Sequence, residues 1–213
     1  MKRNPLGWKL NFTSNIPVKV LVYKLNDFSF KDIWQKALVP QEIHRMNKFN
    51  FQIDADRFAA RRYLAKFLIA DLFNSDLSDI NFKYSKFGKP YLQDRHLFFN
   101  WSFSNDLLAI VISTHFPAGI DIEFINPDFV FLPLWEKVVT NQDIAPDRLT
   151  FFKYWTAHEA IIKLFGKSLS NMSFSRNFEF LSNGNVIIDD LPGIMITQRM
   201  IPNYIITTAV IPD

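Results

Sequence analysis

The chain has 213 residues, of which 48% are hydrophobic and 16% aromatic, so it has enough apolar material for the core of a globular protein. The absence of cysteine excludes disulfides, thiolate metal sites and cysteine nucleophiles, and the formal net charge of +3 favours an anionic ligand or an acidic partner only weakly. No run reaches the ~20 apolar residues of a membrane span, and the first ten residues are basic without an apolar segment, so we expect no membrane, no secretory signal and a cytoplasmic location.

The first third of the chain predicts a strand, a short helix and a long helix. Residues 18–25 alternate in hydropathy, which favours a strand. Pro40 is expected to open the short helix, because proline is tolerated in a first helical turn. The long helix is predicted from Asp54 to Phe73, with Asp54 or Asp56 as its cap. Its apolar stripe consists of Phe58, Ala65, Leu68, Ile69 and Leu72.

The other side of this long helix is basic. It carries Arg57, Arg61, Arg62 and Lys66, and we expect most of these residues to form a solvated face. Arg57 is the exception, because it falls in the first predicted turn. There the free backbone N–H groups and the helix dipole favour a phosphate.

Residues 82–91 mix lysines with aromatic residues around a turn at Gly88-Lys89-Pro90. Such a mixture can stack a base and hold phosphates, as in grooves that bind single-stranded nucleic acid. It is also typical of a strand end on a basic protein. The pattern alone does not separate these alternatives.

The middle of the chain predicts three strands. Residues 97–104 and 107–113 are expected to pair across a turn at 105–106. Residues 119–123, Gly-Ile-Asp-Ile-Glu, alternate so that Asp121 and Glu123 share one face, with Cα atoms about 7 Å apart. Two such carboxylates can converge on a hard cation such as Mg²⁺. The alternative is an edge strand with one solvated acidic face.

A second helix is predicted over residues 150–165, after an irregular connection at 126–149, and it should stop at Gly166. Trp155, Glu159 and Lys163 share one face of this helix, since they are spaced by four residues. The alternative is a surface Glu–Lys pair, which contributes about 0.2–0.5 kcal/mol. A zinc-protease motif starting at His158 is excluded, because Ile162 occupies the position of its second histidine.

The remaining chain predicts an antiparallel sheet. Residues 178–181 and 186–188 flank an Asn183-Gly184 turn, and strands are also expected over 194–198 and 204–210. Strands and helices in this order indicate an α+β fold.

The motifs at 119–123 and 155–163 together resemble those of the Sfp-type 4′-phosphopantetheinyl transferases. That family has a G-(I/V)-D-(I/L)-E strand and, some tens of residues later, a W-x-x-K-E-x-x-x-K helix. The first motif matches throughout, and the second matches at Trp155, Glu159 and Lys163. The resemblance covers about residues 40–170 and includes the Gly-Lys-Pro turn and the F-N-x-S-x-S pattern with Ser102.

The resemblance implies a pseudo-duplicated α+β fold with the active site between two similar halves. We therefore predict an N-terminal half over residues 1–105, which contacts the nucleotide of coenzyme A. A C-terminal half over 106–213 would supply the metal-binding strand and the Glu159 helix. A monomer is expected, because the two halves complete the site within one chain.

The resemblance also implies the reaction. Family members use Mg²⁺ to move the 4′-phosphopantetheine arm of coenzyme A to a serine of an acyl or peptidyl carrier protein, releasing 3′,5′-ADP. Metal ligands would be Asp121, Glu123 and Glu159, and the catalytic residues would be Glu159, as proton acceptor, and Lys163, as charge stabiliser. Coenzyme A would be bound by Arg57, Lys89, Pro90, Ser102 and His158.

The sequence departs from the family pattern at two positions. Phe103 replaces a histidine that helps to hold phosphates, and His158 replaces a lysine. A lost hydrogen bond to a charged group costs roughly 1.5–3 kcal/mol. We therefore expect Phe103→His to tighten coenzyme A binding and His158→Lys to raise turnover.

Two other function classes stay open. One is a degenerate relative that binds coenzyme A or a carrier protein without catalysis. The other is a basic nucleic-acid-binding module that uses residues 82–91. Three carboxylates around an anionic ligand count against both alternatives, so we expect no nucleic acid as partner.

Overall fold

The computed structural model describes residues 10–13, 18–24, 34, 37–93, 97–167 and 177–212. In the first half these form β1 (Leu10–Thr13), β2 (Val18–Lys24), α2 (Pro40–Met46), α3 (Gln52–Phe73), η2 (Leu77–Asp79), β3 (Lys83–Tyr84), β4 (Pro90–Tyr91), β5 (Phe98–Ser104) and β6 (Leu107–Ser113). The second half contains β7 (Ala118–Phe124), η3 (Leu132–Leu134), α4 (Trp135–Val138), α5 (Arg148–Phe165), β8 (Phe178–Phe180), β9 (Asn185–Ile188), β10 (Met195–Ile201) and β11 (Tyr204–Val210). Among the described residues, no helix is long and apolar enough to cross a membrane.

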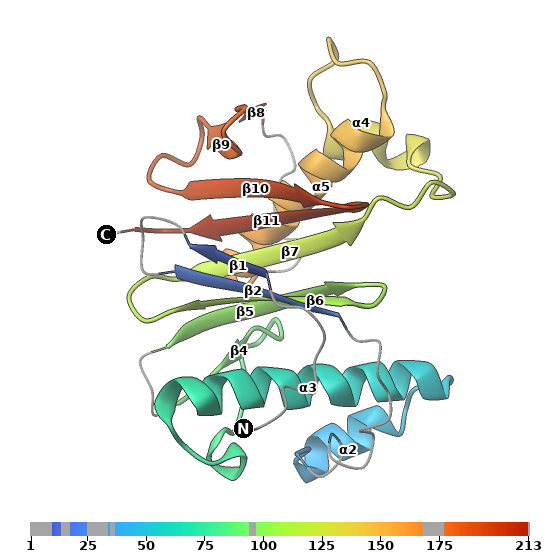
Figure 1. The fold of residues 1–213 in the computed structure, drawn as a ribbon. Coiled ribbons are helices and arrows are strands. Elements are labelled where there is room, and N and C mark those ends of the chain that lie inside the picture. Colours follow the sequence, from blue (N-terminus) through green and yellow to red (C-terminus); the bar gives the residue numbers. More distant parts are fainter. Residues whose placement is uncertain are drawn as a thin grey trace.

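The first half is an antiparallel sheet with the order β1-β2-β6-β5, covered on one face by α3 (Figure 1). Every side chain of β6 is buried, because this strand is central and is covered on both faces. Leu108, Ile110 and Ile112 pack with α3, whereas the alternate residues Leu107 and Val111 join the core on the other face.

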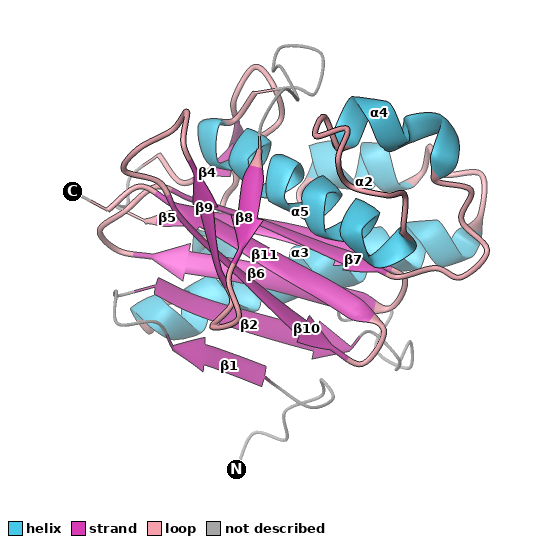
Figure 2. Cartoon of the chain, turned by 90° about the horizontal axis from the view of Figure 1, so that it is seen from above, coloured by secondary structure: helices cyan, strands magenta, loops and turns pink. Residues whose placement is uncertain are grey.

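The second half repeats this plan with the sheet β7-β11-β10-β9-β8 and the helix α5 (Figure 2). Ile205 and Ala209 of β11 pack in the same core as Ala157 and Ile161 of α5. A short β3-β4 hairpin forms a sheet of its own, which contacts β5 of the first sheet. The prediction of an α+β fold built from two similar halves is confirmed.

The two sheets meet through a third apolar cluster. It joins Val20 and Val22 of β2 to Ile120 and Ile122 of β7. The face of β7 that carries the alternate residues is thereby turned toward α5. Because β5 and β7 are edge strands of their own sheets and lie in contact, their side chains meet at the junction of the two halves.

The predicted division of the chain after Asn105 has to be corrected. It separates β5 from β6, which pair from Phe98↔Ser113 to Ser104↔Leu107 in one hairpin. The chain passes from one sheet to the other between β6 and β7, over residues 114–117. A turn at 105–106 connects two strands of the same sheet.

The start and the basic face of α3 also differ from prediction. The helix begins at Gln52 after Phe51, and neither Asp54 nor Asp56 caps it. Arg62 and Lys66 are buried rather than solvated, because both reach the buried carboxylate of Glu42 in α2, at 3.5 and 3.1 Å. Hydropathy alone predicts that these cations face solvent. In the structure their ion pairs with Glu42 offset the free-energy cost of burying the charges.

Candidate active site

Strand β7 turns Asp121 and Glu123 toward α5, as the alternation of its residues predicts. Ile120 and Ile122 fill the core on the other face. Gly119 lets the helix approach, because a Cβ at this position would collide with the Ala160 carbonyl oxygen and the Leu164 backbone. The missing side chain therefore sets the distance between the acidic strand and the helix.

Helix α5 is firmly delimited at both ends. The Asp147 carboxylate accepts hydrogen bonds from the N–H groups of Leu149 and Thr150, and Gly166 ends the helix in the left-handed conformation. Trp155, Glu159 and Lys163 are half-buried, unlike most residues of this helix. They form the predicted face of α5.

Lys163 lies at the centre of a network that joins the two halves. Its ammonium donates to Asp121 Oδ1 at 2.5 Å and to Ser102 Oγ at 2.8 Å. The Ser102 hydroxyl in turn donates to Asp121 Oδ1 at 2.7 Å. Residues of β5, β7 and α5 thus meet at one point, as predicted for a site between the halves.

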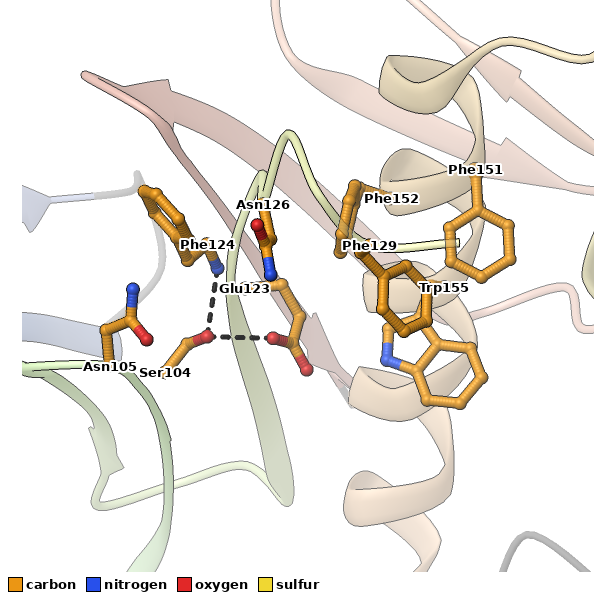
Figure 3. Close-up of a pocket in the computed structure, with 9 residues that line it drawn as sticks. All are labelled: Ser104, Asn105, Glu123, Phe124, Asn126, Phe129, Phe151, Phe152 and Trp155. Atoms are coloured by element: carbon orange, nitrogen blue, oxygen red, sulfur yellow. Dashed lines mark hydrogen bonds between the residues drawn. The ribbon is translucent and has the colours of Figure 1, made fainter. Parts of the chain in front are cut away.

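Glu123 belongs to a neighbouring set of contacts. Ser104 Oγ donates to Glu123 Oε2 at 2.8 Å and accepts the Phe124 N–H at 2.9 Å (Figure 3). Beside this carboxylate a pocket of about 260 Å³ opens, with Trp155 in its wall. The rest of the lining is Asn105, Asn126, Phe124, Phe129, Phe151 and Phe152.

The electrostatics of the site favour an incoming cation. Burial, followed by the charge of Asp121, raises the pKa of Glu123 to about 7, although hydrogen bonds from Ser104 and Trp155 and the charge of Lys163 oppose this rise. Burial also raises the pKa of Glu159, with a further contribution from Asp121. Asp121 Oδ2 is buried without a hydrogen-bond partner. A carboxylate oxygen in that condition is costly unless a positive group approaches it.

These carboxylates are chemically suited to Mg²⁺, which prefers oxygen ligands. Within the ranges the structure describes, however, no three acidic or histidine side chains are gathered closely enough to hold a metal. The cation on Asp121 is the ammonium of Lys163. The oxygen donors of these side chains and the unpartnered Oδ2 of Asp121 nevertheless fit a metal ion such as Mg²⁺.

Two family models match the chain one after the other. Residues 29–115 match the model described as 4′-phosphopantetheinyl transferase, N-terminal, and residues 117–200 match the 4′-phosphopantetheinyl transferase superfamily. The chain belongs to the 4′-phosphopantetheinyl transferase superfamily. The two matches divide between β6 and β7, where the structure passes from one half to the other.

Individual 4′-phosphopantetheinyl transferases are similar to much of the chain. HetI of Nostoc sp. is 28% identical over 148 residues, which cover 64% of this chain and 62% of that protein. A phosphopantetheinyl transferase of Thraustochytrium sp. is 26% identical over 186 residues, covering 77% and 65%. Sfp of Bacillus subtilis is 28% identical over 159 residues, covering 70% of each. The chain thus aligns with less than two thirds of the length of the first two.

Lys89, in the Gly-Lys-Pro turn, makes hydrogen bonds within the protein that hold this turn in place. The Lys89 ammonium donates to the carbonyl oxygens of Leu164, at 2.6 Å, and Ala118, at 3.3 Å. These contacts tie the Gly-Lys-Pro turn to the last turn of α5 and to the start of β7. Pro90 is buried, and burial lowers the pKa of Lys89 to about 8.

The prediction that His158 binds coenzyme A is wrong for this structure. The imidazole is 3% exposed, lies 4.8 Å from the Phe178 ring and has Nε2 3.1 Å from the Val138 carbonyl oxygen. Its neighbour Glu159 faces the junction, so His158 points elsewhere on the helix. A motif position that is usually lysine in the family is here a core residue.

Arg57 does not lie in the first turn of α3, where it was predicted. Because α3 begins at Gln52, Arg57 lies in its second turn, where backbone N–H groups are already used by the helix. Its guanidinium lies 3.8 Å from Asp54 and is one-third exposed. The side chain is available to an anion, but the helix terminus does not help it.

Sequence reasoning missed the supporting role of Ser104 and the contact of Trp155 with Glu123. Strand alternation could have indicated the role of Ser104, because Ser102 and Ser104 lie on the same face of β5 and so point to the same junction. Helix spacing places the Trp155 indole on the face of Glu159 and Lys163 but does not show that it reaches Glu123. Its N–H becomes relevant once the distance between β7 and α5 is known.

Proposed function

We propose that this protein transfers the 4′-phosphopantetheine arm of coenzyme A to a serine hydroxyl of an acyl or peptidyl carrier protein, releasing 3′,5′-ADP. The main support is the meeting of Asp121, Lys163 and Ser102 at the junction of the halves. Membership of the superfamily and the names of the relatives point to the same reaction.

In the proposed reaction the serine oxygen attacks the phosphorus that carries the pantetheine arm. The bond from that phosphorus to the bridging oxygen of 3′,5′-ADP breaks, and the serine proton is taken up by a carboxylate. Glu159 is suited to this role, because burial raises its pKa and so strengthens it as a base. Lys163, fixed by Asp121 and Ser102, would neutralise charge on the phosphoryl oxygens.

Asp121, Glu123 and Glu159 would hold Mg²⁺. When bound, the ion neutralises the charge of the pyrophosphate. Asp121 offers the buried oxygen that lacks a partner, and Glu123 would be kept ionised by the added positive charge. Ser104 positions the Glu123 carboxylate for this purpose.

The pocket beside Glu123 would accept the pantetheine arm. The arm carries no charge, and the aromatic wall of the pocket offers apolar contact near the carboxylates. Since β5, β7 and α5 of one chain form the junction, a monomer suffices for the reaction. We propose no role for nucleic acid, because the ammonium of Lys89 in the 82–91 stretch is directed at backbone carbonyls.

The test is to incubate the protein with coenzyme A, Mg²⁺ and an apo carrier protein, and to look for the phosphopantetheine mass increment on the carrier. We expect modification by the wild type and loss of it with a chelator or in Glu123→Ala. The exposed Glu179 provides the matched control, Glu179→Ala. Coenzyme A binding without modification of any carrier would favour a degenerate, non-catalytic relative.

A further inference from the structure

A hydrogen bond at the end of β7 joins the two halves of the chain outside the reacting groups. The hydroxyl group of Tyr204, the first residue of β11, donates to Asp106 Oδ1 at 2.8 Å. Asp106 lies in the turn between β5 and β6 and belongs to the first half, whereas Tyr204 belongs to the second. This contact, the Tyr204–Asp106 link, therefore connects one half directly to the other.

Each partner of the link is held by its own half. The ring of Tyr204 packs against Phe124, its register partner on β7, with ring centroids 5.2 Å apart. The second oxygen of Asp106 lies 3.4 Å from the ammonium of Lys24 in β2. Burial, followed by the hydrogen bond to Asp106, raises the pKa of Tyr204 to about 12, although a hydrogen bond with the Asn105 side chain opposes this rise. The hydroxyl therefore keeps its proton and remains a donor at neutral pH.

The link lies close to the serine that contacts Glu123. Ser104 is the last residue of β5, directly before the turn. Its Oγ donates to Glu123 Oε2 and accepts the N–H of Phe124 (Figure 3). Phe124 is in turn the strand partner of Tyr204. The contacts from Ser104 to Phe124, on to Tyr204 and back through the turn therefore form a closed ring across the junction.

The rest of the junction is held by contacts nearer the start and the middle of β7. Lys89 binds a carbonyl oxygen at the start of this strand, and Ser102 binds the carboxylate in its middle. At its end, beyond Ser104, the halves are joined by the Tyr204–Asp106 link. Each region of the junction thus has its own contact, and loss of this one would free the end of β5 next to Glu123.

The position of the Glu123 carboxylate matters, because a metal site requires its ligands to be held closely in their productive geometry. Ser104 holds one oxygen of this carboxylate, and removal of a partner of this kind typically costs about 10- to 100-fold in metal affinity. Ser104 can hold the carboxylate only if the end of β5 is itself fixed. A residue that fixes this end acts on the metal site through Ser104, without touching metal or substrate.

We propose that Tyr204 is a positioning residue of the metal site, because its hydrogen bond to Asp106 holds the end of β5 so that Ser104 keeps Glu123 in place for Mg²⁺. The inference rests on the proposed function, since it takes Glu123 as a metal ligand. It assigns a role in the site to a contact that lies outside the reacting groups.

The test measures the binding of Mn²⁺ to the protein with coenzyme A bound, by the loss of the electron paramagnetic resonance signal of the free ion. Tyr204→Phe keeps the ring and removes the hydroxyl, so the affinity for Mn²⁺ should fall about 2- to 10-fold, the loss expected for one hydrogen bond. The affinity for coenzyme A without metal should stay unchanged. The control Tyr154→Phe removes another tyrosine hydroxyl of the second half, whose acceptor, the Phe178 carbonyl oxygen, lies in the same half. It should bind Mn²⁺ as the wild type does.

A double-mutant cycle separates positioning from a general loss of structure. Ser104→Ala should weaken Mn²⁺ binding more than Tyr204→Phe does, since Ser104 contacts the carboxylate directly. Adding Tyr204→Phe to Ser104→Ala should then cause no further loss, because the link acts through Ser104. Wild-type affinity in Tyr204→Phe, losses that add in the double variant, or an equal loss in Tyr154→Phe would each overturn the inference.

The same measurements keep this inference apart from the proposed function. If the wild type binds Mn²⁺ and modifies a carrier protein while Tyr204→Phe binds the ion equally well, only the role of Tyr204 is wrong. If the wild type neither binds Mn²⁺ nor modifies a carrier protein, the proposed function fails and the inference fails with it.

Discussion

The side chains at the junction show how a few charged groups depend on one another. Asp121 is 2% exposed, and its Oδ1 receives both Lys163 and Ser102. A buried carboxylate of this kind is stable only with such donors. The sequence could predict that Asp121 and Glu123 share a face, because strand alternation is local. It could not predict that Lys163 would bind Asp121, since the two residues lie 42 positions apart.

The buried position of His158 reverses the expectation that lysine improves this site. His158→Lys would place an ammonium in the core near Val138 and Phe178, where desolvating an ion costs several kcal/mol. We expect a clearly lower melting temperature and no gain in turnover. Thermal denaturation of this variant beside the exposed His44→Lys checks it, and an unchanged melting temperature with faster turnover would restore the family-based assignment.

Lys89 gives a pH dependence of stability with a definite sign. Because burial lowers its pKa from 10.5 to about 8, the unfolded chain binds more protons than the folded chain between these values. The stability of the wild type relative to Lys89→Met should therefore be constant below pH 8 and rise between about pH 8 and 10.5. Urea unfolding of both proteins on either side of pH 8 measures this difference. A difference that is flat or falls with pH would contradict the buried position.

At the scale of elements, α5 is tied to its sheet by a buried polar network. Thr156 Oγ1 lies 2.8 Å from Thr207 Oγ1, and Gln198 Nε2 donates to both hydroxyl groups at 3.1 and 2.9 Å. Thr207 is the register partner of Asp121, so the same strands that fix the helix also fix the acidic residue. Periodicity and turn residues predict both long helices and most of the longer strands, although not β1, whereas this network depends on pairing between strands.

Gly119→Ala tests the approach of α5 to β7. The added Cβ would meet the Ala160 carbonyl and the Leu164 backbone, so the helix has to shift. Overpacking of this kind typically costs about 1–3 kcal/mol. We expect a lower midpoint in urea, together with weaker transferase activity, because Glu159 and Lys163 move with the helix. Ser182→Ala at an exposed turn is the control, and a Gly119→Ala midpoint equal to the wild type would show that the contact is loose.

Across the whole molecule, the two halves share the arrangement of an antiparallel sheet with a long helix, but they contribute different side chains to the junction. The first half offers hydroxyl groups from β5 and cations from α3, and the second offers carboxylates from β7 and α5 together with the ammonium of Lys163. The groups that meet at the junction therefore come from both halves of the chain. The basic face of α3 was wrongly predicted as solvated because its burial depends on α2 and β5, which contact it only in the folded chain.

The rate of carrier modification by Glu159→Gln, followed by mass, tests the central claim most directly. Glu159→Gln keeps the size of the side chain and removes its charge, and the exposed Glu136→Gln is the matched control. Loss of a general base lowers a rate roughly 10²- to 10⁴-fold, and we predict a loss in this range with coenzyme A binding retained. Wild-type rates in Glu159→Gln would contradict the account.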